Sequence, residues 1–159
     1  MPVSIRPAVA ADSALILQFI RDLAEYEKLL DTVEATEAHV TAALFGDHPR
    51  AFADIAELDG VPVGFALWFY NFSTFVGRHG IWLEDLFVRP EARGAGAGKA
   101  LLAGLARRCV DENLGRLEWS VLDWNAPSIA FYDSLGAAAM DEWTIRRLTG
   151  EALKSLAEA

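Results

Sequence analysis

Three alternating glycines, Gly94, Gly96 and Gly98, separate a strand-like apolar run that stops at Pro90 from a helical pattern over about residues 96–112. The change of period predicts a strand, then a loop almost without side chains, then an amphipathic helix. The first N–H groups of a helix have no partner within it, and small residues let an anion approach the backbone. The sequence therefore predicts an α/β fold with an anion site at the start of this helix. The alternative is that the glycines only form a tight turn.

Two well-known phosphate loops do not fit this stretch. The dinucleotide-binding fingerprint needs glycine at its first, third and sixth places, and the sixth place here is Lys99 or Leu101. The Walker loop needs glycine at position 93 and a hydroxyl at position 100, and the chain has Arg93 and Ala100 there. What remains is a glycine-rich helix start with an arginine in front of it, which adds a positive charge.

The spacing of apolar residues divides the rest of the chain into short strands and helices. Asp59-Gly60 is a hairpin signal between two apolar runs, and Asn125 is a plausible helix cap. Residues 1–159 contain no linker and no internal repeat, which predicts a single domain. The expected strands lie at 3–6, in the two hairpin arms within 51–72, and at 79–90, 116–124 and 140–148. The expected helices lie within 10–30, after Thr36, at 96–112, at 125–136 and in the tail, which gives the order β-α-α-β-β-β-α-β-α-β.

Composition limits the partners and the compartment. The formal net charge of −9 argues against a nucleic-acid partner and is compatible with a cationic small substrate or simply with solubility. A single cysteine, Cys109, excludes an internal disulfide and favours a cytoplasmic protein. The first residues lack a signal-peptide pattern. The longest apolar run, "GFALWFY", is much shorter than the roughly 20 residues of a membrane-spanning helix, so we expect no membrane segment.

The pattern Arg-x-x-Gly-x-Gly, formed by Arg93, Gly96 and Gly98, resembles the pyrophosphate-binding motif of the GNAT N-acetyltransferases. In that family the motif holds the pyrophosphate of acetyl-coenzyme A. Three longer blocks, residues 5–28, 82–102 and 123–137, resemble the diamine acetyltransferases, the spermidine/spermine and thialysine branch. The resemblance implies the GNAT fold, a central mixed, mostly antiparallel twisted sheet flanked by about four helices, and a homodimer.

The resemblance also implies a set of site residues. The pantetheine arm of the cofactor would contact the backbone of Leu86, Phe87 and Val88. The rest of the cofactor would lie against Arg93, Gly94, Ala95, Gly96, Ala97, Gly98, Lys99, Asn125, Ala126, Pro127, Ser128 and Tyr132. The amine substrate would contact Tyr26, Glu27, Glu84, Glu118, Trp119, Ser120 and Glu142, although the spacing before Glu142 is shorter than is usual in the family.

The chemistry of acetyl transfer needs a group that removes a proton from the amine. An alkyl amine with a pKa near 10.4 is neutral in only about 0.04% of molecules at pH 7. Glu84 is the candidate base, directly or through water, because strand alternation places it with Trp82 and Leu86 on one face. Alternation turns Asp85 to the opposite face, which predicts a structural role for it. The alternative for Glu84 is a solvated carboxylate on a strand edge.

The leaving thiolate needs a proton, and a phenol can donate it. Tyr132 is the candidate acid, with the adjacent Phe131 packed inside, because neighbouring helical residues point in different directions. The developing oxyanion would be held by the backbone N–H of residue 86 or 87. Cys109 is expected to be a buried thiol. The three histidines, His39, His48 and His79, show no metal-ligand spacing, so we expect no metal.

These features predict an acetyl-coenzyme A-dependent N-acetyltransferase that acts on a primary amine of a small cationic molecule, a polyamine or a lysine-like amino acid. Two alternatives remain at this point. The same fold could acetylate another amine, such as a protein N-terminus, an antibiotic or an amino-acid analogue. The chain could also be a coenzyme A-binding sensor without catalysis.

Overall fold

The computed structural model describes residues 2–159 of the chain. It contains two compact units, one that ends at Ser120 and one that covers Val121–Ala159. The first unit holds the whole sheet and three α-helices, and the second holds two short helices. No helix among the described residues has the length and apolar character needed to cross a membrane.

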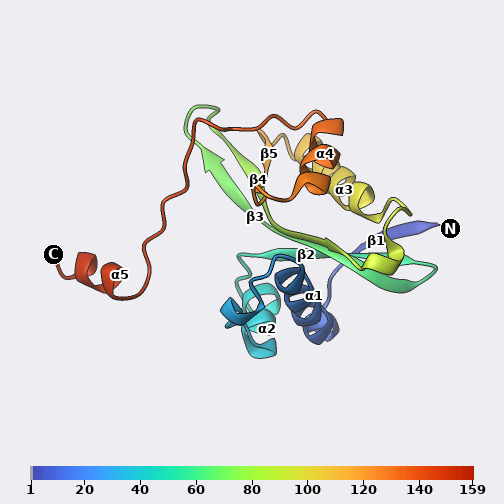
Figure 1. Cartoon of the computed structure of the whole chain (residues 1–159), viewed down its shortest axis with the longest axis horizontal. Helices are drawn as coiled ribbons and strands as arrows, with labels where there is room; N and C mark the ends of the chain where they lie inside the picture. Colours follow the sequence, from blue (N-terminus) through green and yellow to red (C-terminus); the bar gives the residue numbers. More distant parts are fainter. Residues whose placement is uncertain (1) are drawn as a thin grey trace. The chain divides into compact units, whose positions relative to one another are not determined.

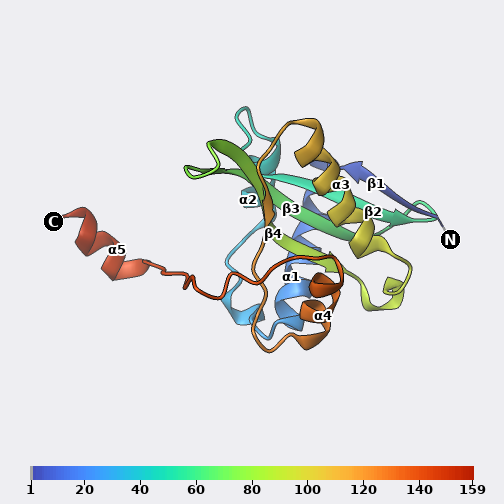
Figure 2. The ribbon, with the colours of Figure 1, turned by 90° about the horizontal axis from the view of Figure 1, so that it is seen from above.

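The first unit is a five-stranded sheet with helices on both faces. Its strands run in the order β1-β2-β3-β4-β5, and every neighbouring pair is antiparallel except the parallel pair β4 and β5. This confirms the predicted mixed, mostly antiparallel sheet. Helices α1 and α2 cover one face and α3 lies across the other (Figure 1, and from above in Figure 2). The elements are β1 (Val3–Pro7), α1 (Ser13–Tyr26), α2 (Glu37–Phe45), β2 (Phe52–Leu58), β3 (Val61–Ser73), β4 (Arg78–Val88), α3 (Ala97–Asp111) and β5 (Leu117–Glu118).

Local sequence signals explain where several elements begin and end. The hairpin between β2 and β3 turns at Asp59 and Gly60, both with positive φ (52° and 78°), as expected for an Asp-Gly turn of this length. Helix α2 begins after Thr36, whose hydroxyl accepts a hydrogen bond from the backbone N–H of His39 at 3.2 Å. Both signals are confirmed.

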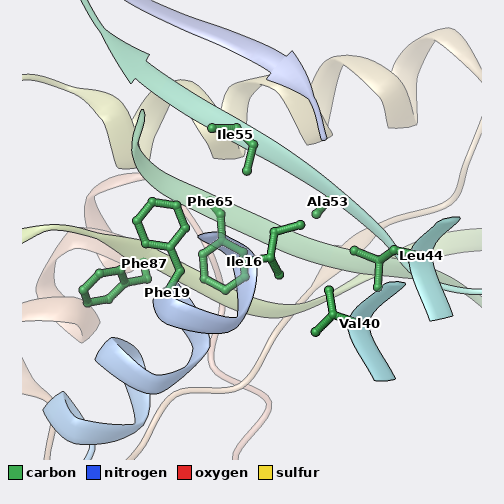
Figure 3. Close-up of a cluster of buried hydrophobic side chains, with 8 residues drawn as sticks. All are labelled: Ile16, Phe19, Val40, Leu44, Ala53, Ile55, Phe65 and Phe87. Carbon is green, nitrogen blue, oxygen red and sulfur yellow. The ribbon is translucent and has the colours of Figure 1, made fainter. Parts of the chain in front are cut away.

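The main core lies between the sheet and helices α1 and α2. Phe19 of α1 is fully buried and stacks on Phe65 of β3, with ring centroids 5.4 Å apart. Burial of such side chains contributes about 1.5–3 kcal/mol each, which fixes α1 over β3 and β4. Figure 3 shows the cluster between the strands and the two helices; its members are Ile16, Phe19, Val40, Leu44, Ala53, Ile55, Phe65 and Phe87. On the other face, α3 buries Leu101, Leu102 and Leu105.

Strands β3 and β4 leave no room for a side chain at Gly64. A Cβ atom at this position would lie 2.4 Å from the backbone oxygen of Phe87 and 3.1 Å from the Cα of Val88. Both are backbone contacts in a paired strand, so neither can move aside cheaply. Glycine is therefore required here because of the strand spacing.

Replacing Gly64 with alanine is expected to lower the free energy of unfolding by about 1–3 kcal/mol, the usual cost of overpacking. The matched control is Gly104→Ala in the interior of α3, where an added Cβ meets no atom within 4 Å. That change is expected to stabilise the protein by up to about 1 kcal/mol, because alanine favours helix. Urea denaturation of both variants tests the pair, and equal effects would contradict the assignment of Gly64.

The second unit contains α4 (Ala126–Ser134) and α5 (Gly150–Ala157). The side chain of Asn125 accepts a hydrogen bond from the backbone N–H of Ser128 at 3.4 Å, which confirms the predicted cap of α4. Gly136 follows the helix with a φ of 81°, as expected for a helix exit.

Two expected strands differ from the structure. The strand predicted at 140–148 does not form, since these described residues make only a turn and irregular backbone. The strand predicted at 116–124 is reduced to β5, two residues long. A strand exists only where a neighbouring strand offers hydrogen bonds, and β5 pairs with β4 only at Ile81 and Trp82. Alternation of side chains does not show whether such a neighbour is present.

Candidate active site

The three glycines form an open loop at the start of α3, as predicted. Gly94 and Gly96 have φ values of 90° and 89°, a left-handed conformation that glycine adopts readily. A Cβ added at either position would meet no atom within 4 Å. Helix α3 begins at Ala97, and no side chain caps it. The first N–H groups of the helix therefore have no side-chain cap, and the loop in front of them is open, which fits the close approach of a diphosphate.

Arg93 lies directly in front of this loop and connects it to α1. Its Nε donates a hydrogen bond to the backbone oxygen of Val88 at 3.0 Å. Its guanidinium carbon lies 5.2 Å from the ring centroid of Tyr26, the last residue of α1, and 5.9 Å from that of Phe87. The structure thus brings together Arg93, Tyr26 and the end of β4, which were expected in one site. Lys99 is exposed in the first turn of α3.

One edge of β4 has no strand partner along its second half. Strand β3 pairs with β4 as far as Val88, whereas β5 pairs with it only at Ile81 and Trp82. Among the described residues, no other strand takes the place of β5 beyond that point. Backbone groups around Leu86 can therefore bind an extended chain that carries amide groups, and pantetheine is such a chain.

A β-bulge interrupts β4 in front of this edge. Leu67 of β3 pairs with Asp85 and the next residue, Trp68, pairs with Leu83, so Glu84 is the extra residue of the bulge. Leu67 packs against the core cluster beneath α1 and α2, whereas Trp68 packs against Arg108 of α3. Directly opposite residues share a face, so Asp85 lies on the face of α1 and Leu83 on that of α3.

The direction expected for the Asp85 side chain is wrong because of the bulge. Simple alternation places Glu84 and Asp85 on opposite faces, but the extra residue returns Asp85 to the face of its neighbour. Glu84 shares the face of Trp82, as predicted, and Nε1 of Trp82 donates a hydrogen bond to its carboxylate at 3.0 Å. The expectation that Leu86 shares this face is wrong, because Leu86 follows Asp85 beyond the bulge and pairs with Ala66 on the α3 face. Both acidic side chains therefore lie on the α1 side of β4.

Glu27, Glu84 and Asp85 form a carboxylate cluster on this side. Glu27 caps the C-terminal end of α1, and Glu84 is exposed while the other two are half-buried. The pKa of the Asp85 carboxyl is raised to about 7, first by burial and then by the negative charges of Glu84 and Glu27. Burial also raises the pKa of Glu27. Such a cluster attracts a cation and can accept a proton near neutral pH.

Among the residues expected on the amine side of β5, Glu118 already has partners. Glu118 accepts a hydrogen bond from Nε of Arg116 at 2.9 Å and forms an ion pair with it. The amide of Asn71 lies 3.5 Å from the same carboxylate oxygen. Trp119 and Ser120 follow directly and are half-buried and exposed, respectively. Glu118 therefore carries less uncompensated charge than the carboxylate cluster.

The remaining expected residues belong to the second unit. Residues 125–128 form the first turn of α4 with its buried asparagine cap. Phe131 and Tyr132 are both half-buried, with ring centroids 5.6 Å apart, so burial does not separate their roles. Glu142 is exposed in a turn. The roles expected for these residues therefore stay predictions.

Cys109 is buried in α3, as predicted, and burial raises the pKa of its thiol. A raised pKa leaves little thiolate, so the group is a poor nucleophile. Among residues 2–159 no group of three or more histidine, cysteine, aspartate or glutamate side chains could hold a metal ion.

Sequence reasoning missed Asp85 as a member of the site. The only sequence signal is that two adjacent carboxylates interrupt the apolar run "GIWLEDLFV". One of them must face the core if the strand is regular, and a buried carboxylate is costly. That conflict could have suggested a bulge.

Comparisons with known proteins agree with this arrangement. The model of the acetyltransferase (GNAT) family matches residues 16–137. A thialysine N-epsilon-acetyltransferase of Bos taurus is 39% identical over 166 residues, which cover 98% of this chain and 97% of that protein. An L-ornithine N5-acetyltransferase of Arabidopsis thaliana is 43% identical over 98 residues, which cover 62% of this chain and 43% of that protein.

The fold is also found among solved structures. An integron cassette protein from the mobile metagenome of V. cholerae superposes with a TM-score of 0.81 at 28% identity, and the match covers 100% of this chain and 99% of that protein. The similarity therefore extends beyond the glycine loop to both units of the chain.

Proposed function

The chain belongs to the acetyltransferase (GNAT) family, and from this premise we propose that it transfers the acetyl group of acetyl-coenzyme A to a primary amine of a small cationic molecule. The observation that carries the proposal is the identity with a thialysine N-epsilon-acetyltransferase along nearly the whole length of both proteins. The carboxylate cluster supports a cationic substrate, because it places three acidic side chains on one side of β4.

Acetyl-coenzyme A supplies the thioester of the reaction. We propose that the N–H groups at the start of α3 bind its diphosphate, with the positive charge of Arg93 nearby. The unpaired edge of β4 would bind pantetheine through Leu86, Phe87 and Val88, and residues 125–128 would continue the cofactor site. The fit rests on the open space around Gly94 and Gly96 and on the missing strand partner of β4.

The amine must lose a proton before it can attack the thioester. We propose that Tyr26 and Glu27 help to bind the substrate cation at the end of α1, and that Glu84 meets the amine and draws the proton from it, directly or through water. Glu118, Trp119, Ser120 and Glu142 remain proposed substrate contacts that follow from the family resemblance. The backbone N–H of Leu86 or Phe87 would stabilise the oxyanion.

The departing sulfur must gain a proton. We propose that the hydroxyl of Tyr132 donates it, as the resemblance to the family implies. A neutral thiol does not attack the new amide, so this step makes the transfer effectively irreversible. The assignment needs no metal ion.

The two named relatives narrow the substrate class. Thialysine and ornithine are both amino acids with a primary amine at the end of the side chain, and both relatives are named for acetylating that amine. We propose an amino acid of this type as the substrate, with a polyamine as the alternative. A cytoplasmic homodimer is a further proposal, and it rests on the resemblance to the diamine branch.

Release of free thiol from acetyl-coenzyme A in the presence of an amine panel tests the function. The panel should contain thialysine, lysine, ornithine, spermidine and a protein N-terminal peptide. The proposal expects turnover with one of the first four and little with the peptide. If calorimetry shows that coenzyme A binds but no amine releases thiol, the chain is a sensor and the catalytic proposal is wrong.

A further inference from the structure

We propose that Asp85 holds the proton that the substrate ammonium gives up, and that this proton reaches it through Glu84 or a water molecule. The inference rests on the proposed acetyl transfer and adds a residue to it. The bulge in β4 carries the argument, because it places Asp85 beside Glu84 on the α1 face. A regular strand would direct Asp85 towards α3 and away from Glu27.

Apolar residues flank Asp85 within the sheet. It pairs across the sheet with Leu67 of β3, and the next residue on its face is Phe87, which is 5% exposed. Because Glu84 is exposed and Asp85 is not, the two carboxylates have different roles. Glu84 is in contact with solvent and can meet the cation, whereas Asp85 lies behind it in a drier position.

The charged groups around this position determine how Asp85 titrates. Glu84 lies on the same strand and Glu27 at the end of α1, and both raise the pKa of Asp85. Two basic side chains lie on this side: Arg93 lies over the rings of Tyr26 and Phe87, and Arg89 lies over the ring of Phe19. The residue of β3 directly opposite Asp85 is Leu67, which is apolar. A carboxyl group with a pKa of about 7 is well matched to removing a proton at neutral pH.

The step can be written with all atoms conserved. The ammonium R–NH3+ and the Asp85 carboxylate become R–NH2 and the Asp85 carboxylic acid. The nitrogen lone pair then forms the bond to the thioester carbon, and the C–S bond breaks with its electrons on sulfur. The sulfur takes the Tyr132 proton, and Tyr132 regains one from the attacking nitrogen, which carries two hydrogens and a positive charge until it loses this proton and becomes the neutral amide N–H. Asp85 later returns its proton to solvent, so each turnover yields amide, thiol and one H+.

The test is the pH dependence of kcat/KM with the best amine of the panel. For the wild type, the logarithm of kcat/KM is expected to rise with pH with a slope of one up to about pH 7 and then to level off. Asp85→Asn is expected to lose on the order of a hundredfold in kcat/KM at pH 7. Its activity should recover steadily towards pH 10, where the amine is neutral without help. Asp85→Glu should restore part of the loss.

Two further variants separate this role from general damage. Asp54→Asn is the matched control, because Asp54 is another half-buried carboxyl with a raised pKa, and it bonds to Trp68 on the α3 face. It should leave the profile unchanged. Glu84→Gln should raise KM and move the inflection to lower pH, since it removes a charge that raises the pKa of Asp85.

The outcomes distinguish this inference from the proposed function. If the wild type is active and Asp85→Asn has the same pH profile, the proposed role of Asp85 is overturned and the proposal of acetyl transfer stands. The same loss in Asp54→Asn also overturns it, because the effect would then be structural. A wild type that releases no thiol with any amine overturns both proposals together.

Discussion

Replacing Tyr132 with phenylalanine is expected to lower kcat at neutral pH by about two to four orders of magnitude, the range for loss of a general acid. The ring remains, so packing in α4 next to Phe131 is preserved. Affinity for coenzyme A should change by less than about threefold, because the hydroxyl acts on the leaving sulfur and not on the diphosphate. The rate of thiol release gives kcat, and calorimetry gives the affinity for coenzyme A.

The control for this variant is Tyr70→Phe. The hydroxyl of Tyr70 donates a hydrogen bond to Glu112 at 2.7 Å on the α3 side of the sheet, so its removal costs a contact without touching the proposed site. We expect turnover within about twofold of the wild type for this control, as is usual for a change away from the reacting atoms. If Tyr132→Phe turns over like the wild type, Tyr132 is not the general acid.

Asparagine at position 85 is expected to make the protein more stable above pH 7. The pKa of Asp85 is about 7 in the folded protein and about 3.9 in an unfolded chain. Between these values the folded state keeps a proton that the unfolded chain has lost, so stability falls as the pH rises through this window. The loss attributable to Asp85 is up to about 4 kcal/mol. Asparagine carries no such proton and should remove this part of the pH dependence.

Urea denaturation of the wild type and of Asp85→Asn at pH 5 and pH 8 measures the effect. The difference between the two proteins should be larger at pH 8. Asp12→Asn is a control of opposite sign, because hydrogen bonds from Arg6 at 2.8 and 3.0 Å lower the pKa of Asp12. Ionised Asp12 stabilises the fold above about pH 4, and its loss should destabilise the protein at pH 8. An equal effect of Asp85→Asn at both pH values would show that Asp85 is not desolvated.

Elements that depend on local chemistry were predictable from the sequence. Thr36 and Asn125 cap their helices through their own side chains, and Asp59-Gly60 turns the chain by its own dihedral preferences. The same holds for the glycine loop, whose conformation depends on residues next to one another. These signals need no knowledge of the rest of the fold.

Features that depend on a distant partner were not predictable in this way. The segment 140–148 has strand-like residues, but pairing with a neighbour decides whether a strand forms. The bulge at Glu84 is likewise a property of the register between β3 and β4, and the direction of Asp85 follows from it. The sequence therefore indicated which strand would carry the acids, and only the structure shows which face each one occupies.

The glycine loop also limits what mutational scanning can reveal. Its proposed recognition of an anion uses backbone N–H groups and the dihedral angles of Gly94 and Gly96, with no contribution from a side chain of the loop itself. Both positions between the glycines, Ala95 and Ala97, are already alanine. Truncation to alanine would leave them unchanged, so a conventional scan would understate a binding surface whose specificity lies in main-chain shape.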